Sequence, residues 1–264
     1  MPELPDVEVS RRYLESTSLK RRVERVRTDG GRLFGDSDRK ATLEALEGSR
    51  LEETARHGKN LFVRLSAGPW LLMHFGMSGF LKAYRRPDSA PDHPRLVMEL
   101  DDGSSLAYDS QRLLGRLGLA EGPAEYARQK GLGPDLLFED MTARRFADAL
   151  DGSRGMIKPA LMDQTRMAGL GNVYTDEALF QYGLHPKRKA PSLSGSDLEG
   201  LFGTVREVLE RAVDFGADVG SAPSDWLLPH RDGDSRCPRC GGELQRIGVS
   251  GRTSWVCPER QPAP

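Results

Sequence analysis

The sequence has little cysteine and no excess of charge of either sign. Of its 264 residues only three are Cys, and all three lie between positions 237 and 257. Three cysteines so close together cannot build a disulfide framework, so we interpret them as metal ligands. The 38 Lys and Arg residues are balanced by 39 Asp and Glu residues, for a formal net charge of −1. A nucleic-acid-binding surface must therefore come from segregation of basic residues rather than from their excess.

Long apolar runs are also lacking. No stretch of about 18 apolar residues is present, which argues against a membrane-spanning helix, and no secretory apolar region follows Met1. We therefore expect a cytoplasmic protein with no membrane partner. The length is sufficient for two domains that each have a core.

Basic residues do gather in two segments. Residues 11–32 carry eight basic side chains against three acidic ones, and residues 236–260 carry five against two. Such clusters are more often solvated surface than binding sites. They are compatible with a nucleic-acid partner but do not establish one.

The apolar pattern predicts an α+β fold with a mostly β N-terminal half, two packed sheets forming a sandwich beside a first helix near 5–17. A helical region and a small β-hairpin that turns at Ser250–Gly251 should follow. The expected strands are 61–65, 70–73, 80–84, 95–100 and 105–108. The expected later helices are 144–150 after Thr142, 156–166, 172–182 and 198–215 after Ser196.

Shifts in composition predict four segments along the chain. They are a β-sandwich domain at 1–120, a Gly- and Pro-containing connector at 121–135, a helical domain at 136–230, and a hairpin segment at 231–264.

Pro2 and Glu3 form the first candidate site. If Met1 is removed, Pro2 has a free secondary amine, and an α-amino group titrates near pH 8, so part of it is nucleophilic at physiological pH. Glu3 would supply a carboxylic acid beside it, as imine chemistry at a sugar carbon requires. The alternative is an ordinary helix start, because proline and acidic residues are both favoured in a first helical turn.

Gly169-Leu170-Gly171-Asn172 lies between two expected helices. Glycines there let the backbone approach a ligand, and the N–H groups of the following helix can bind an anion. The element would then be a helix-two-turn-helix that grips a phosphate, with Asn172 as a further donor. The alternative is a Gly-rich turn with Asn172 as helix cap.

Six motifs occur in order along the chain, and together they resemble the Fpg/Nei family of DNA glycosylases over residues 2–261. They are Pro2-Glu3-Leu4-Pro5, Arg56-His57-Gly58-Lys59-Asn60, His74-Phe75-Gly76-Met77-Ser78-Gly79, Ile157-Lys158-Pro159, Gly169-Leu170-Gly171-Asn172, and a cysteine-bearing tail with Arg252 and Cys257-Pro258. The resemblance implies a bifunctional DNA glycosylase and AP lyase of base-excision repair. The resemblance also implies that the protein binds double-stranded DNA carrying damaged bases or abasic sites. The protein is expected to be a monomer associated with a bacterial nucleoid and to need no redox cofactor.

The resemblance also implies roles for single residues. Pro2 would attack C1′ of the flipped nucleoside, Glu3 would open the sugar ring, and Lys59 would hold a phosphate beside the lesion. Six further residues would bind DNA. Of these, Met77 and Leu114 would fill the space left by the flipped base, Arg112 would face the orphaned base, and His74, Asn172 and Arg252 would contact phosphates. Otherwise Lys59 is simply solvated, His74 structural, and Met77 and Leu114 are core residues.

The tail departs from the family pattern. Cys237, Cys240 and Cys257 match zinc ligands, but Arg260 stands where a fourth cysteine is expected. From this we expect zinc to be weakly held, through three thiolates plus water or Glu259, or absent, with Arg252 still presented to a phosphate. Two alternatives of other classes remain open: a non-catalytic DNA-binding paralogue, and a zinc-ribbon interaction module joined to an unrelated β domain.

Overall fold

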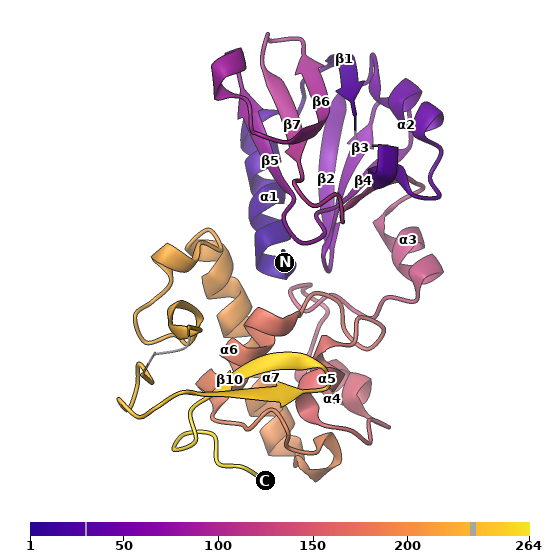
Figure 1. The fold of residues 1–264 in the computed structure, drawn as a ribbon. Helices are drawn as coiled ribbons and strands as arrows, with labels where there is room; N and C mark the ends of the chain where they lie inside the picture. Colours follow the sequence, from indigo (N-terminus) through magenta and orange to yellow (C-terminus); the bar gives the residue numbers. More distant parts are fainter. Residues whose placement is uncertain (30, 233–235) are drawn as a thin grey trace. The chain divides into compact units, whose positions relative to one another are not determined.

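The computed structural model describes residues 1–29, 31–232 and 236–264, and the chain forms two compact units. Unit 1 comprises Met1–Pro2 and Asp6–Lys130, and unit 2 comprises Glu3–Pro5 and Gly131–Pro264. Residues 3–5 therefore belong to unit 2, although the residues before and after them belong to unit 1. Figure 1 shows the strands of unit 1 and the mostly helical unit 2.

Unit 1 contains two four-stranded antiparallel sheets, with strand orders β1-β6-β7-β5 and β2-β3-β4-β8. Apolar side chains from both sheets, including Leu61 and Leu106, share one buried core with Val7 and Leu14 of helix α1. The strands are β1 (Val23–Thr28), β2 (Leu51–His57), β3 (Asn60–Leu65), β4 (Trp70–His74), β5 (Phe80–Tyr84), β6 (Pro94–Leu100), β7 (Ser105–Asp109) and β8 (Arg116–Ala120). The helices are α1 (Leu4–Thr17), α2 (Arg39–Leu46) and α3 (Pro123–Lys130), with 3₁₀ turns at Gly31–Phe34 and Pro87–Ser89.

In the part of unit 2 that the structure describes, four α-helices pack around an apolar core that includes Leu4 and Trp226. Residues 174–180 of helix α6 are all buried. The helices are α4 (Ala143–Leu150), α5 (Ile157–Met162), α6 (Asn172–Tyr182) and α7 (Gly195–Asp214). Three short 3₁₀ turns lie at Ala190–Ser192, Val219–Ser221 and Leu228–His230.

A two-stranded hairpin, β9 (Gln245–Val249) and β10 (Arg252–Val256), completes unit 2. Its turn is at Ser250 and Gly251, which both have positive φ angles, as a tight hairpin turn requires. Trp255 and Leu244 pack against Phe180 of α6, so the hairpin shares a small core with the helices. None of the helices that the structure describes is long and apolar enough to cross a membrane.

The predicted α+β class, the sandwich, the helical region and the hairpin are confirmed. Two details were wrong. The last long helix is capped by Ser194 instead of Ser196, and the helix expected at 156–166 ends at Met162. The expected connector at 121–135 includes helix α3. The expected segment 231–264 includes residues 233–235, which lie outside the described residues.

Candidate functional site

Glu3 caps helix α6. Its carboxylate accepts hydrogen bonds from the backbone N–H groups of Gly171 at 2.8 Å, Val173 at 2.8 Å and Tyr174 at 3.2 Å. The first N–H groups of a helix have no partner within it and carry partial positive charge, so a carboxylate is well placed there. The side chain is only 1% exposed. Glu3 is thus held in a fixed orientation inside unit 2.

The glycines of the 169–172 segment make room for this arrangement. A Cβ atom on Gly171 would lie 2.4 Å from Cδ of Glu3, and one on Gly169 would lie 2.4 Å from Cδ1 of Leu4. The Leu4 N–H also donates to the Gly169 carbonyl at 3.1 Å. The segment therefore receives residues 3 and 4, and Gly171, not Asn172, is the N-cap of α6.

Pro2 precedes the first helical residue, Leu4, by two positions, so the geometry of a helix start does not account for it. Pro5 is the proline of the first turn. Pro2 is half-buried, whereas Met1 is 57% exposed. The contacts of Glu3 with the N-terminus of α6 therefore fix the residue directly bonded to Pro2.

Lys59 lies in the turn between β2 and β3. The buried ion pair of Arg56 with Glu8 stabilises this turn. The guanidinium of Arg56 donates through Nε to Glu8 at 3.2 Å and through Nη1 to the Gly58 carbonyl at 3.2 Å. Gly58 has a φ of +56°, a conformation that favours glycine. The Glu8–Arg56 contact of α1 with β2 therefore fixes the backbone from which Lys59 projects.

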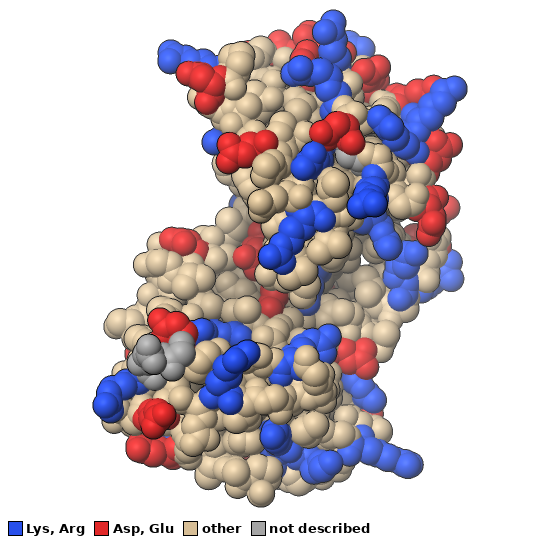
Figure 2. Space-filling model, in the orientation of Figure 1, with Lys and Arg blue, Asp and Glu red and all other residues tan. Residues whose placement is uncertain are grey.

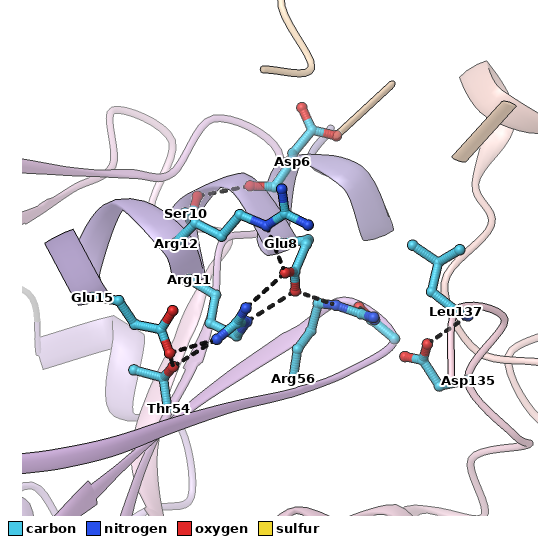
Figure 3. A network of polar contacts seen from close by, with 11 residues as sticks. Asp6, Glu8, Ser10, Arg11, Arg12, Glu15, Thr54, Arg56, Asp135 and Leu137 are labelled. Atoms are coloured by element: carbon cyan, nitrogen blue, oxygen red, sulfur yellow. Dashed lines mark hydrogen bonds and ion pairs between the residues drawn. The ribbon is translucent and has the colours of Figure 1, made fainter. Parts of the chain in front are cut away.

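Glu8 is the centre of this network, as Figure 3 shows. Burial raises the pKa of Glu8, but the guanidinium groups of Arg11, Arg56 and Arg12 outweigh this effect and hold the pKa at about 2. Arg11 also donates to Glu15 and to Thr54 of β2, which ties the helix to the sheet. Glu8 is thus an anion at neutral pH with three cationic partners.

His74 ends β4 opposite Asn60, the neighbour of Lys59. Burial lowers the pKa of His74, and the positive charges of Lys59 and Arg116 lower it further. Its Nδ1 accepts a hydrogen bond from the Gly76 N–H at 3.2 Å, so the neutral ring carries its proton on Nε2. The side chain can therefore donate one hydrogen bond, as a phosphate contact requires.

Met77, Arg112 and Leu114 lie on two neighbouring loops of unit 1. Met77 is 45% exposed and Leu114 is 57% exposed, so neither is a core residue. The Arg112 guanidinium lies 3.8 Å from the Met77 sulfur. A Cβ atom on Gly76 would lie 2.4 Å from the Leu114 backbone, so the loops touch directly at this glycine. The three side chains form an exposed apolar and cationic cluster of the kind that can replace an extruded base.

Tyr108 supports both loops from the core, a role that the sequence did not indicate. Its hydroxyl donates to the His74 carbonyl at 3.0 Å, and its ring stacks on Phe75. Cβ atoms on Gly79 and Gly115 would lie within 2.9 Å and 1.8 Å of the same hydroxyl. The sequence feature that could have indicated this role is the pair Gly79 and Gly115, which lie at the ends of the two loops.

Lys158 and Asp176 form a buried ion pair in unit 2, with both side chains 1% exposed and Nζ 2.6 Å from Oδ1. Lys158 also donates to the Ser254 hydroxyl at 2.5 Å, and Asn172 donates to the Thr253 carbonyl at 3.0 Å. Burial raises the pKa of Asp176 and lowers that of Lys158. These contacts bind the hairpin to α5 and α6. The sequence motif contained Lys158 but did not indicate this partner.

Arg252 begins β10 and is exposed beside the hairpin turn. Figure 2 shows Lys and Arg side chains over the hairpin side of unit 2, with acidic side chains mainly toward the edges of that face. Basic residues are thus segregated locally, although the chain as a whole has no positive excess.

The sulfur atoms of Cys237, Cys240 and Cys257 lie within 4.8 Å of one another. The Gly242 amide lowers the pKa of the Cys240 thiol, but desolvation and hydrogen bonds with Cys257, Cys237 and Glu259 raise it to about 12. Three thiols at such separations can bind one zinc ion, which prefers sulfur ligands in tetrahedral geometry. The donor set therefore fits zinc.

The structure brings the predicted residues together in groups. In unit 1, Met77, Arg112 and Leu114 adjoin one another and Lys59 lies near His74. In unit 2, Asn172 and Arg252 belong to the joined α6 and hairpin, and Glu3 caps the same helix. The three cysteines form one cluster.

Three family descriptions match consecutive parts of the chain. Residues 1–117 match the formamidopyrimidine-DNA glycosylase N-terminal domain, residues 132–223 match the H2TH domain of that enzyme, and residues 234–259 match the zinc finger found in FPG and IleRS. The matches run in the order expected for that enzyme.

Relatives match over the full length of the chain. A formamidopyrimidine-DNA glycosylase of Symbiobacterium thermophilum is 37% identical over 279 residues, covering 100% of this chain and 90% of the relative. A formamidopyrimidine-DNA glycosylase of Halorhodospira halophila is 34% identical over 270 residues, covering 99% of this chain and 100% of the relative. A solved MutM bound to DNA containing carbocyclic 8-oxo-G has a TM-score of 0.88 at 29% identity, covering 99% and 100%. Lactococcus lactis Fpg bound non-covalently to DNA with an AP site has a TM-score of 0.87 at 28% identity, covering 99% and 100%.

The zinc-finger match corrects the expectation that zinc is weakly held or absent. The match covers residues 234–259, and the fold gathers the three thiols within reach of one ion in spite of Arg260. The loss of one cysteine was therefore given too much weight, because the fold still brings three thiols to positions that could hold a metal ion.

Proposed function

Since the chain belongs to the formamidopyrimidine-DNA glycosylase family, we propose that it excises oxidised bases from double-stranded DNA and then cleaves the abasic strand as an AP lyase. The family gives the first activity, DNA glycosylase action in base-excision repair. The lyase activity and the residue roles are our proposal. We further assign this activity to the bacterial cytoplasm.

The proposed nucleophile is the secondary amine of Pro2 after removal of Met1. Its nitrogen attacks C1′ of the extruded nucleoside, the glycosidic bond breaks, and the base leaves with the bonding electron pair and a proton. Glu3 donates a proton to the ring oxygen, so the sugar opens to an iminium. The observation that carries this proposal is the anchoring of Glu3 on the N-terminus of α6 by three N–H groups. Because one peptide bond joins Pro2 to Glu3, the anchored carboxyl group belongs to the residue next to the amine.

Strand cleavage follows from the iminium. Loss of a C2′ proton to water expels the 3′ phosphate, and a second elimination, with loss of the C4′ proton to water, expels the 5′ phosphate. Water then hydrolyses the remaining iminium, which releases the sugar fragment as an aldehyde and frees the Pro2 amine. Lys59 holds a phosphate beside the lesion, with His74 donating from Nε2 to the backbone. These steps transfer only protons and phosphate leaving groups.

The remaining residues bind and distort the duplex. Met77 and Leu114 occupy the space of the extruded base, and Arg112 faces the orphaned partner base. Asn172 and Arg252 bind backbone phosphates. Cys237, Cys240 and Cys257 would hold a structural zinc ion, which would supply folding energy to the finger that carries Arg252. We assign the excision chemistry and the replacement of the extruded base to segment 1–120, and the phosphate contacts of Asn172 and Arg252 to segments 136–230 and 231–264, joined by 121–135.

A non-catalytic DNA-binding paralogue is the competing function. The presence of Pro2, Glu3 and Lys59 favours the enzyme, because binding alone does not need an amine beside a carboxyl. Borohydride trapping on duplexes with 8-oxoguanine, formamidopyrimidine, thymine glycol, dihydrouracil or an abasic site separates the two. A covalent adduct supports the enzyme, and tight binding with no adduct on any duplex supports the paralogue.

Two variants separate the chemical steps. Glu3→Gln should abolish base excision but retain binding and part of the cleavage of a preformed abasic site. Lys59→Ala should weaken excision of a damaged base more than cleavage at an abasic site. An unchanged excision rate in Glu3→Gln would remove Glu3 from the mechanism.

A further inference from the structure

The zinc site lacks its fourth ligand in the expected place. Structural zinc is almost always bound by four ligands, and the three thiols supply only three. Position 260 carries an arginine, whose guanidinium remains protonated and cannot ligate a cation. Another side chain of this chain, or a water molecule, must therefore complete the coordination.

The Glu259 carboxylate lies beside the thiol cluster. A Cβ atom on Gly242 would lie 2.7 Å from Oε1 of Glu259 and 3.4 Å from the Cys240 sulfur. The oxygen and the sulfur thus share the space that a side chain at position 242 would fill. Glu259 is also a hydrogen-bonding neighbour of the Cys240 thiol. The glycine at 242 is what admits the carboxylate to the cluster.

The local backbone supports this placement. The Arg260 N–H donates to the Cys257 carbonyl at 3.2 Å, and the Cys257 N–H donates to Oε1 of the buried Gln261 at 3.1 Å. The turn after Cys257 is therefore tight and anchored, and Glu259 projects from it while remaining exposed. Among the described residues Glu259 forms no ion pair with Lys or Arg, so its carboxylate is not already committed to a cation.

We propose that Glu259 is the fourth ligand of the zinc ion, which makes the site Cys₃Glu. A carboxylate oxygen is an established ligand for zinc, although sulfur and nitrogen are commoner in structural sites. Three thiolates and a carboxylate give the site a net negative charge. Arg236, whose guanidinium donates to the Gly241 carbonyl at 3.2 Å, lies on the same loop and offsets part of that charge. This inference is independent of the excision chemistry.

The test compares zinc retention and cobalt spectra in the full-length protein. Zinc per chain is measured by elemental analysis, and the release rate is measured with a chelator in excess. The variants are Glu259→Gln, which keeps the shape of the side chain, and Gly242→Ala, which fills the space of the carboxylate. Glu243→Gln is the control, because Glu243 is an exposed carboxylate of the same finger.

The wild-type protein and Glu243→Gln should hold one zinc per chain and release it at the same slow rate. Glu259→Gln and Gly242→Ala should release it about 10-fold faster or more, as expected when a ligand or its support is lost. The visible spectrum of the Co²⁺-substituted protein should also change in Glu259→Gln, because one ligand atom is exchanged. Adding Arg260→Cys to Glu259→Gln should restore slow release.

Two outcomes would overturn the proposal. One is a Glu259→Gln protein that retains zinc as firmly as the wild type and has the same cobalt spectrum, which would assign the fourth position to water. The other is a wild-type protein that, refolded with excess zinc, binds none. Trapping of abasic DNA by the same preparations shows whether the catalytic unit is intact, so failure of the zinc proposal is distinguishable from failure of the proposed function.

Discussion

The carboxylate of Glu3 accepts a hydrogen bond of 2.8 Å from the backbone N–H of Gly171, a residue 168 positions later in the chain. The contact requires glycine at position 171. A Cβ atom there would lie 2.4 Å from the Glu3 carboxyl carbon. A helix N-terminus in unit 2 therefore fixes the residue that follows the proposed nucleophile.

We predict that Gly171→Ala impairs base excision although it leaves every proposed catalytic group in place. The added methyl group must displace the Glu3 side chain, at a cost of about 1–3 kcal/mol for overpacking. Single-turnover excision should fall by about 10-fold or more. Gly195→Ala is the matched control, since nothing lies within 4 Å of a Cβ atom at that helical glycine. Equal rates in the two variants would contradict the positioning role.

Met77→Ala should reduce excision of an intrahelical lesion more than cleavage at an abasic site. The apolar side chain stabilises the extruded state, and an unpaired abasic site costs less to extrude. Single-turnover rates on the two duplexes give the comparison. Val219→Ala, which truncates another exposed apolar side chain, serves as control. Equal losses on both duplexes would assign Met77 a packing role.

Glu8 should make stability depend on pH. Its pKa is lowered from 4.5 to about 2 in the folded protein, so its contribution is fully present above pH 4.5 and is lost as the pH falls toward 2. Glu8→Gln should therefore lower the free energy of unfolding by about 2 kcal/mol at pH 7 and by much less near pH 3. Urea titrations of both proteins across this range measure the difference. A difference that does not change with pH would exclude the ionised network as its source.

Arg252→Ala should weaken DNA binding with little dependence on sequence. An arginine that neutralises one phosphate releases its counterions, so the slope of log affinity against log salt should fall by about one. Fluorescence anisotropy on an undamaged duplex at several salt concentrations measures both quantities. A weaker affinity with an unchanged slope would mean that Arg252 does not contact a phosphate.

The sequence predicted the central strands of the two sheets and one edge strand, β5, but not the other three edges. The missed strands β1, β2 and β8 are all edge strands. Edge strands carry more charge and less apolar pattern, as the segments Val23–Thr28 and Leu51–His57 do. Helix α3 was missed because Pro123 was interpreted as a sign of a connector, whereas proline is also favoured at the start of a helix.

The candidate site was only partly predictable for a related reason. Motifs identified Glu3 and Lys59 because each lies in a short stretch of recognisable residues. The contacts that position the site depend on pairings between distant residues, which no local pattern encodes. Arg56 pairs with Glu8 beneath the turn that carries Lys59, and Lys158 pairs with Asp176 beneath the hairpin that carries Arg252. The zinc site was underestimated because one missing cysteine was considered without the geometry of the other three.

The most direct test of the central claim is to locate the covalent adduct. The purified protein is incubated with abasic duplex and borohydride, digested, and analysed by mass spectrometry alongside the intact mass of the free protein. We predict a protein that begins at Pro2 and an adduct on the Pro2 nitrogen, with most of the trapping lost in Pro2→Gly. An adduct on a lysine side chain, or Met1 retained in a fully active preparation, would contradict the proposed mechanism.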